Sequence, residues 1–280
     1  MNIGIIGLGL IGGSLARSIR ANTQHTVLGY DTDKATMLRA KAIDAIHDEL
    51  TDALLLQCDI VLVALYPEMC ADWIIAHADN FGDGAVVIDC AGVKRYVCQR
   101  VEPVAAEKNW TYIGGHPMAG REFSGFAYAR ADLFKNASMI LTPNEDADIR
   151  TREKIKRFFL EMGFKMVRFC SPAAHDQMIA YTSQLAHVVS GAYVKNPLSG
   201  EHKGFSAGSF LDMTRVARLN ENMWTELFME NADLLLPALD DIIARLNEYR
   251  DVLASGDPEK IRPVLREGRL CKEALDEPIL

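Results

Sequence analysis

The chain has 280 residues, of which 49% are hydrophobic and 24% are charged, and its formal net charge at pH 7 is −8. These values are ordinary for a globular protein, so they exclude a disordered, collagen-like or coiled-coil chain, and the length suits two modest domains. Because nucleic-acid binding needs a basic surface, the negative charge argues against DNA or RNA as a partner, whereas a small anionic substrate needs only one or two cations.

Neither a membrane span nor a secretory signal is expected. No stretch reaches about 18 uninterrupted apolar residues, and the apolar N-terminus lacks a basic region and is broken by glycines. The six cysteines are scattered without a CxxC pair, which is typical of free thiols in a reducing compartment. They are Cys58, Cys70, Cys90, Cys98, Cys170 and Cys271. The sequence therefore predicts a cytoplasmic protein.

Short apolar runs and amphipathic stretches alternate over residues 1–170. The predicted strands are Asn2–Ile6, Thr26–Tyr30, Ile60–Ala64, Ala85–Asp89, Thr111–Gly114, Ser138–Leu141 and Lys165–Phe169. The predicted helices include Gly13–Arg20, Asp33–Ala42, Pro67–Ala78 and Lys94–Lys108. Continuous apolar strands separated by helices indicate a mainly parallel sheet covered on both faces. With right-handed crossovers this is a doubly wound, Rossmann-type α/β domain.

A motif of the form GxGxxG follows the first predicted strand and opens the first predicted helix. It consists of Gly7, Leu8, Gly9, Leu10, Ile11 and Gly12. Asp31 directly follows the second predicted strand, 19 residues after Gly12. This context is that of a dinucleotide-binding fingerprint, rather than of a glycine-rich turn in another α/β protein. Since Asp31 can accept both ribose hydroxyls and repel a 2′-phosphate, NAD is expected rather than NADP.

The part of the chain after Phe169 is predicted to be all helical. Ser171 is a candidate N-cap with Pro172 at the first helical position, and no breaker follows until about Lys195. Further helices are expected over Phe210–Leu219, Met223–Ser255 and Pro258–Leu275, with Pro237 as a candidate interruption. We therefore expect a dinucleotide-binding domain over residues 1–170 and an all-α substrate and dimerisation domain over residues 171–280.

Three candidate site features lie outside the glycine motif. His116 follows a predicted strand within Gly114–Gly120, where a neutral imidazole could accept a substrate proton or merely tie down the loop. Arg215 is either a surface cation or a carboxylate ligand. A polar and small-residue stripe on the long helix is either a cleft wall or a solvent-facing stripe. It contains Asp176, Ala180, Ser183, Gln184, His187 and Gly191. No metal site is expected, because tight Cys/His clusters and HExxH are missing.

Taken together, the motifs resemble those of the prephenate dehydrogenase family, over nearly the whole chain. They are GLGLIGGSLA at the start, GGHPMAG around His116, Ala174-His175-Asp176, and DMTRVA followed by Met223-Trp224. The resemblance implies NAD-dependent oxidative decarboxylation of prephenate to 4-hydroxyphenylpyruvate in tyrosine biosynthesis, by a short form without a mutase or regulatory domain. It implies a homodimer formed through the helical domain.

The same resemblance assigns roles to single residues. His116 matches the catalytic histidine, Arg215 the carboxylate-binding arginine, and His187 the second histidine of an SHLPH-like motif. The implied substrate-binding set is Arg215, His187, Gln184, Arg121 and Glu122. Leu65 and Gly92 join the glycine motif and Asp31 in the implied cofactor site.

Two departures from the family pattern and three alternatives stay open. Gly92 replaces a serine that the family often has near the nicotinamide, and Gln184 replaces the first histidine of the SHLPH-like motif. The substrate could be arogenate, which carries an amino group in place of the keto group of prephenate. A β-hydroxyacid dehydrogenase would place a catalytic lysine within the long helix, whereas Lys195 comes at its end. A non-catalytic NAD-binding sensor would have no use for the GGHPMAG loop and Arg215 together.

Overall fold

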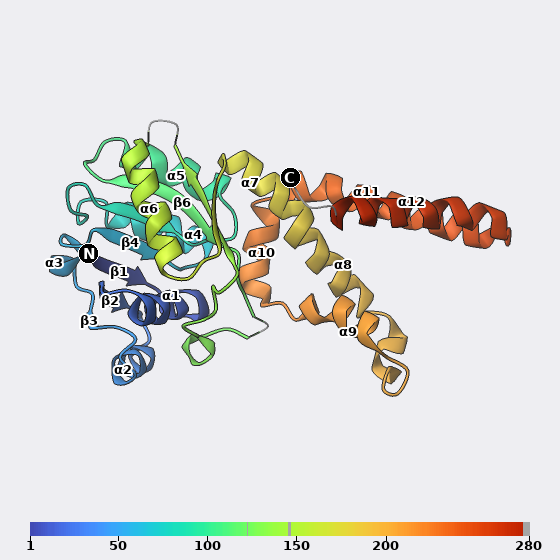
Figure 1. The fold of residues 1–280 in the computed structure, drawn as a ribbon, viewed down its shortest axis with the longest axis horizontal. Coiled ribbons are helices and arrows are strands. Elements are labelled where there is room, and N and C mark those ends of the chain that lie inside the picture. The colour runs from blue at the N-terminus through green and yellow to red at the C-terminus, as the bar shows by residue number, and fades with distance from the viewer. Residues whose placement is uncertain (122, 145–146, 277–280) are drawn as a thin grey trace. The chain divides into compact units, whose positions relative to one another are not determined.

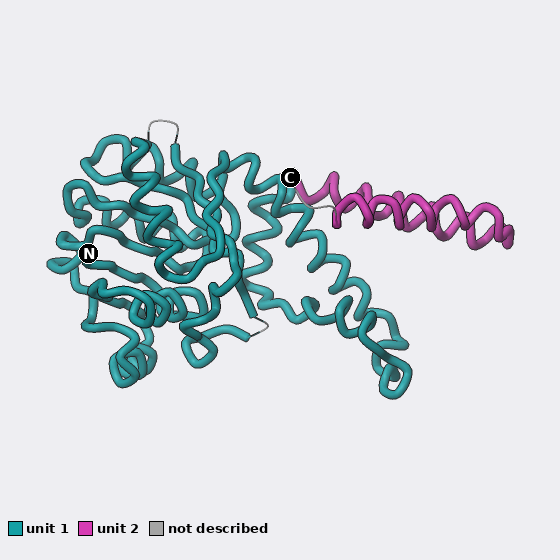
Figure 2. Tube along the Cα trace, in the orientation of Figure 1, with its two compact units in different colours: residues 1–232 teal, residues 233–280 magenta. Residues whose placement is uncertain are grey.

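The structure is a computed structural model that describes residues 1–121, 123–144 and 147–276 (Figure 1). It divides into two compact units, residues 1–232 and residues 233–280 (Figure 2). The domain boundary predicted near residue 170 lies inside the first unit, and it stays a prediction. Within the described part of the chain, no helix combines the length and the apolar character needed to cross a membrane.

An eight-stranded sheet forms the centre of the first unit, counted over the described residues. Its strands are β1 (Asn2–Ile6), β2 (Thr26–Tyr30), β3 (Asp48–Glu49), β4 (Ile60–Val63), β5 (Val86–Asp89), β6 (Thr111–Pro117), β7 (Ser138–Pro143) and β8 (Met166–Phe169). The order is β3-β2-β1-β4-β5-β6-β7-β8, and only the β6–β7 pair is antiparallel. The first six strands have the Rossmann order, which confirms the predicted fold class.

Helices cover both faces of the sheet. They are α1 (Leu10–Asn22), α2 (Lys34–Ala42), α3 (Asp52–Leu55), α4 (Pro67–Ala76), α5 (Arg95–Ala105) and α6 (Ile149–Glu161). Successive residues of a strand point to opposite faces. In β4, Ile60 and Leu62 therefore join a core with α1, α2 and α6, while Val61 and Val63 join a second core with α4 and α5. This burial on both sides explains why the strands are apolar throughout.

The predicted end of the strand that begins at Thr111 is wrong, and this matters for the site. We expected a strand over Thr111–Gly114 with His116 in the following loop, but β6 continues to Pro117. The extension exists because β7 pairs with it antiparallel, with His116 opposite Ile140. Such pairing with a distant segment leaves no local sequence signal. The short strand β3 was also missed, since its two exposed acidic residues carry no apolar pattern.

The predicted helix after Ser171 is continuous in extent but not uniform. It comprises α7 (Pro172–Ile179), a π-helical segment (Ala180–Leu185) and α8 (Ala186–Tyr193). Ser171 caps it as expected, by accepting the backbone N–H of Ala174 at 3.2 Å. The π-helical segment was not predicted, and it changes which residues share a face on its two sides.

The remaining helices correct a second expectation. They are α9 (Gly208–Thr214), α10 (Glu221–Met229), α11 (Ala232–Ala254) and α12 (Pro258–Asp276). Short 3₁₀ turns span Phe126–Tyr128, Pro197–Glu201 and Arg215–Ala217. The long helix expected over Met223–Ser255 is interrupted at Glu230 and Asn231, whereas Pro237 lies inside α11. Asn231 is fully buried and its side chain is hydrogen-bonded, so tertiary contacts rather than a proline set the break.

Candidate active site

The glycine motif forms the turn between β1 and α1 and requires its glycines. Gly7 has φ +80°, and a Cβ there would lie 2.6 Å from the carbonyl oxygen of Ala64. A Cβ on Gly12 would lie 1.8 Å from the carbonyl oxygen of Gly7, whereas the space beside Gly9 is open. Gly9 is the N-cap of α1 and gives it no side-chain cap. The turn therefore leaves room for a phosphate at a helix N-terminus, as a nucleotide site requires.

Asp31 holds this turn from the end of β2. Its Oδ2 accepts the backbone N–H of Leu8 at 2.8 Å, and its Oδ1 accepts the N–H of Asp33 at 2.9 Å. Leu65 lies on the other side, since its Cδ2 is 2.8 Å from the position of a Cβ on Gly7. The structure thus brings the glycine motif, Asp31 and Leu65 together at the carboxyl ends of β1, β2 and β4.

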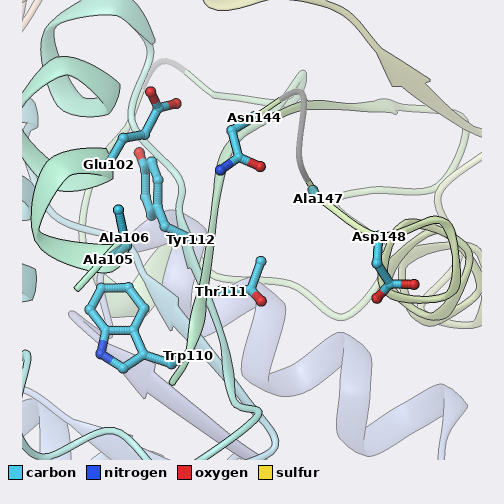
Figure 3. Close-up of a pocket in the computed structure, with 9 residues that line it drawn as sticks. All are labelled: Glu102, Ala105, Ala106, Trp110, Thr111, Tyr112, Asn144, Ala147 and Asp148. Carbon is cyan, nitrogen blue, oxygen red and sulfur yellow. The ribbon is translucent and has the colours of Figure 1, made fainter. Parts of the chain in front are cut away.

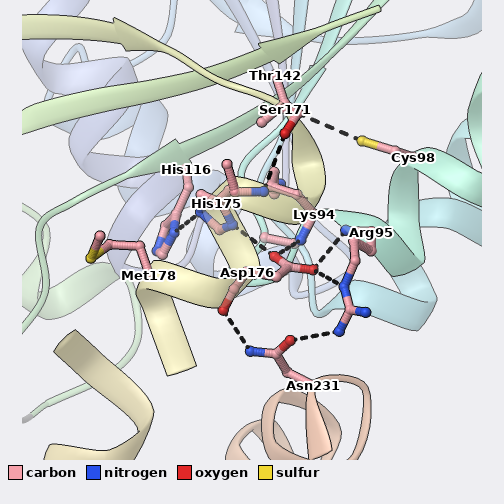
Figure 4. A network of polar contacts seen from close by, with 12 residues as sticks. Lys94, Arg95, Cys98, His116, Thr142, Ser171, His175, Asp176, Met178 and Asn231 are labelled. Atoms are coloured by element: carbon pink, nitrogen blue, oxygen red, sulfur yellow. Dashed lines mark hydrogen bonds and ion pairs between the residues drawn. The ribbon is translucent and has the colours of Figure 1, made fainter. Parts of the chain in front are cut away.

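His116 belongs to a chain of hydrogen bonds that runs into the protein (Figure 4). Its Nδ1 is 2.8 Å from Nε2 of His175, and Nδ1 of His175 is 2.7 Å from Oδ1 of Asp176. His175 and Asp176 are buried in α7, while His116 is partly exposed on β6. His116 and His175 are 59 residues apart in sequence, and their contact joins strand β6 to helix α7.

Both oxygens of the Asp176 carboxylate accept hydrogen bonds. Oδ1 accepts the backbone N–H of Lys94 at 2.8 Å, and Oδ2 accepts the backbone N–H of Arg95 at 2.9 Å and its Nε–H at 3.2 Å. Arg95 also donates to Oδ1 of Asn231 at 2.9 Å. Asn231 in turn donates to the Asp176 carbonyl at 3.0 Å and to Oε1 of Gln184 at 2.8 Å. The network ties α5, α7, the π-helical segment and the α10–α11 break together.

A buried ion pair lies next to the histidine pair. The Lys94 ammonium and the Asp89 carboxylate are both 0% exposed and in direct contact. The ammonium also donates to the carbonyl oxygen of Gly115 at 2.5 Å, and Asp89 accepts the Tyr112 hydroxyl at 2.7 Å. These contacts fix the backbone immediately before His116.

The environment keeps both histidines neutral. Burial lowers the pKa of His116 well below the ordinary histidine value, and the neighbouring His175 and the Lys94 charge lower it further. Burial also lowers the pKa of His175, against the opposing effect of Asp176. Although burial opposes ionisation of Asp176, hydrogen bonds from His175 and from the Arg95 and Lys94 backbone leave the pKa of Asp176 lowered. At neutral pH His116 and His175 are therefore neutral imidazoles, and Asp176 is a carboxylate.

A second group of predicted residues gathers around His187 on α8. Its Nδ1 is 2.8 Å from the Ser183 carbonyl oxygen, and its ring centroid is 4.0 Å from that of Trp224. Burial lowers the pKa of His187, and the nearby positive charge of Arg215 adds to this effect. Arg215 itself is exposed, at the start of the 3₁₀ turn that follows α9.

The other predicted substrate residues lie in different surroundings. Gln184 is buried, and its amide donates to the Leu227 carbonyl at 2.6 Å while accepting from Asn231, so its contacts are with the protein. A Cβ on Gly92 would lie 2.9 Å from Cδ2 of Leu227. Arg121 is exposed after β6, and Glu122 lies outside the described residues.

A surface hollow of about 230 Å³ is separate from this site (Figure 3). It opens at the start of β6, at the opposite end of the strand from His116. Its lining consists of Glu102, Ala105, Ala106, Trp110, Thr111, Tyr112, Asn144, Ala147 and Asp148.

Sequence reasoning did not assign roles to His175, Lys94 or Asn231. His175 and Asp176 were noted only as part of a family motif, since nothing local shows which strand α7 packs against. A signal did exist for Lys94, because a charged residue five positions after an acid at the end of a buried strand needs a partner.

Comparisons with known proteins agree on one family. The family model described as "Prephenate dehydrogenase, nucleotide-binding domain" matches residues 15–168, and "Prephenate dehydrogenase, dimerization domain" matches residues 171–267. The cyclohexadienyl dehydrogenase of Zymomonas mobilis is 32% identical, with 98% of this chain and 96% of that protein covered. The prephenate dehydrogenase of Bacillus subtilis is 28% identical, with 92% and 71% covered.

Solved structures give the same answer. Prephenate dehydrogenase from A. aeolicus, in complex with hydroxyphenyl propionate and NAD⁺, has a TM-score of 0.85 at 26% identity, with 99% of this chain and 98% of that chain covered. Arogenate dehydrogenase from Synechocystis has a TM-score of 0.82 at 25% identity, with 98% and 100% covered. The chain belongs to the prephenate dehydrogenase family.

Proposed function

We propose that this protein is an NAD-dependent dehydrogenase that oxidatively decarboxylates prephenate to 4-hydroxyphenylpyruvate. The observation that carries the proposal is a neutral, partly exposed His116 held by a buried histidine–aspartate pair at the carboxyl end of β6. In α/β folds this edge of the sheet is where ligands bind. We also propose a cytoplasmic location, in keeping with six cysteines that are all free.

The residues around the glycine motif fit a dinucleotide. The open space at Gly9 and the uncapped start of α1 suit its phosphates, and Asp31 suits the adenosine ribose. The match to a nucleotide-binding domain and a solved relative that holds NAD⁺ support NAD as the cofactor. When bound, NAD supplies the hydride acceptor for the carbon that carries the ring hydroxyl.

His116 supplies the base. A neutral imidazole within hydrogen-bonding reach of the ring hydroxyl accepts its proton as the carbon is oxidised. The ring carboxylate then leaves as carbon dioxide and the ring becomes aromatic, which makes the reaction effectively irreversible. The low pKa of His116 keeps it in the accepting form at neutral pH.

Arg215, His187 and Arg121 are the proposed substrate-binding residues. Arg215 and His187 lie near one another, and Arg121 follows the strand that carries His116. A guanidinium pairs with a carboxylate through charge-assisted hydrogen bonds. A grip on the departing carboxylate would stabilise the ground state, so an anchor on the side-chain carboxylate favours turnover.

The first test is a steady-state comparison of prephenate and arogenate with NAD and with NADP. Cofactor reduction with prephenate and NAD is expected. A preference for arogenate would show that the substrate is the one for which the Synechocystis relative is named. No reduction with either substrate would overturn the proposal and leave a nucleotide-binding sensor.

The second test separates the two histidines. His116→Asn should lower kcat by about 10²- to 10⁴-fold, because asparagine can bond the hydroxyl but cannot take its proton. His187→Asn should mainly raise KM. In the wild type, the lowered pKa of His116 means that the neutral base persists as the pH falls, so kcat should decline only below pH 6.5. Normal turnover in His116→Asn, with loss of this decline in His187→Asn, would transfer the base role to His187.

A further inference from the structure

We propose that His175 and Asp176 are positioning residues that hold His116 in one tautomer, with a hydrogen on Nδ1 and a lone pair on Nε2. This inference rests on the proposed function, because it explains how His116 is ready to accept the substrate proton. It adds His175, which contacts His116, and Asp176, which acts on His116 through His175.

The direction of each hydrogen bond in the series His116–His175–Asp176 follows from the carboxylate of Asp176. An ionised carboxylate can only accept, so Nδ1 of His175 must carry a hydrogen and donate it to Asp176. A neutral imidazole carries one hydrogen, which leaves Nε2 of His175 as an acceptor. The bond of 2.8 Å between the rings then requires the hydrogen on Nδ1 of His116. Its Nε2 is left with the lone pair that a general base needs.

The groups around Asp176 require an acceptor at both of its carboxylate oxygens. Its two oxygens accept from His175, from the backbone of Lys94 and Arg95 and from the Arg95 side chain. Since every group facing Asp176 is a donor, an amide in its place would bring an NH₂ group against at least one of them. In Asp176→Asn the amide can turn either its oxygen or its NH₂ group toward His175, so the direction of the hydrogen bonds is no longer imposed.

The charges around the histidine pair also favour its neutral state in the resting protein. Other groups facing the histidine pair are the Lys94 ammonium with its Asp89 partner and the Arg95 guanidinium on Asp176. Lys94 disfavours an imidazolium in the resting protein. Asp176 favours one on His175 once a proton has arrived, because an anion in direct contact stabilises the cation.

The central experiment reads the tautomer directly, without activity. In protein labelled with ¹⁵N-histidine, the ring resonances of His116, assigned by their loss in His116→Asn, should show a protonated Nδ1 and an unprotonated Nε2. In Asp176→Asn the pattern should reverse or become mixed. A wild-type His116 protonated at Nε2 would overturn the proposal, whatever the enzyme does with prephenate.

Kinetics provide the second readout. Asp176→Asn and His175→Phe should each lower kcat by roughly 10²- to 10⁴-fold, the range that general-base catalysis contributes, with KM for prephenate within about threefold. His175→Gln should recover most of the kcat lost in His175→Phe, because its amide can accept from His116 and donate to Asp176. The unfolding temperature of each variant shows whether it folds. If His175→Phe does not fold, the tautomer of His116 in Asp176→Asn tests the positioning role.

His77→Gln is the matched control. His77 lies at the end of α4, where its Nδ1 is 2.8 Å from the Trp73 carbonyl oxygen and its ring stacks on Trp73. It should leave both kcat and the His116 resonances unchanged. A kcat within tenfold of wild type in folded His175→Phe would overturn the positioning role. A wild type inactive on both substrates, with the expected tautomer, would contradict only the proposed function.

Discussion

At the scale of single residues, Asp31 has a structural role in the glycine-rich turn and a proposed role in binding the ribose of the cofactor. Its two carboxylate oxygens already accept the N–H groups of Leu8 and Asp33. Each oxygen has further acceptor capacity, so ribose hydroxyls can bind without loss of these bonds. The negative charge that fixes the turn is thus also the charge that would repel a 2′-phosphate.

Replacing Asp31 with serine should narrow the preference for NAD over NADP, because it removes that repulsion. The measurement is the ratio of kcat/KM for the two cofactors with prephenate saturating. Asp33→Ser is the control, since it removes a nearby charge but retains an N-cap for α2. Equal use of both cofactors by the wild type would contradict the assignment.

Arg215→Ala should raise KM for prephenate by about 30- to 1000-fold, the loss expected for one charge-assisted contact with a substrate carboxylate. The affinity for NAD, measured by titration, should barely change. Arg157→Ala removes an exposed arginine on α6 and should affect neither. A normal KM in folded Arg215→Ala would show that another cation holds the substrate.

Sequence alone could single out His116 as a candidate base, but it could not supply the partners of this residue. The GGHPMAG segment marks the histidine, whereas His175 is 59 residues away and pairs with it only through packing of α7 on the sheet. Gln184 shows the opposite limit. It belongs to a motif associated with binding, yet the fold uses its amide for two internal hydrogen bonds.

At the scale of helices and strands, the local sequence pattern was enough to place an element whose ends do not depend on distant partners. The bounds of β1 and β2 were predicted to the residue, because each is a short apolar run between turns. The extension of β6 and the break after α10 depend on partners far along the chain. The departure at Gly92 belongs here too, since it places the turn after β5 against Leu227 on α10.

Gly92→Ser should destabilise the protein by about 1–3 kcal/mol, because the added Cβ would lie 2.9 Å from Cδ2 of the buried Leu227. Leu227→Ala should cost about 2–5 kcal/mol on its own, through loss of buried side chain. The double variant should cost less than the sum, because truncation of Leu227 makes room for the serine, which in turn fills part of the cavity. Urea unfolding of the four proteins measures this, and strictly additive costs would refute the coupling.

At the scale of the whole molecule, the second unit is, over its described residues 233–276, a helical pair without a substantial core of its own. In α11 and α12, Arg245 and Glu267 lie 4.0 Å apart, and many large apolar side chains are exposed. They are Leu236, Ile243, Leu246, Leu253, Leu265, Leu270 and Leu275. On α11 they recur at steps of seven and three, as in a helix-packing seam. With the match of residues 171–267 to a dimerization domain, this supports a homodimer.

Leu246→Asp combined with Leu253→Asp should weaken that dimer, because two charges would have to be buried on association. Light scattering across a range of protein concentrations measures the mass. Asn247→Asp adds one charge at an exposed neighbouring position of the same helix and should leave the dimer intact. A monomeric wild type would contradict the expectation.

The π-helical segment between α7 and α8 has one more consequence. A π turn accommodates one residue more than an α turn, so it acts as a phase shift of about 100° between the helix faces on its two sides. His175 lies before it and His187 after it. Deleting one residue such as Thr182 would restore α-helical geometry and rotate one histidine away from its present direction. The relative direction of the proposed positioning residue His175 and the proposed substrate anchor His187 is thus set by a residue count, not only by residue identity.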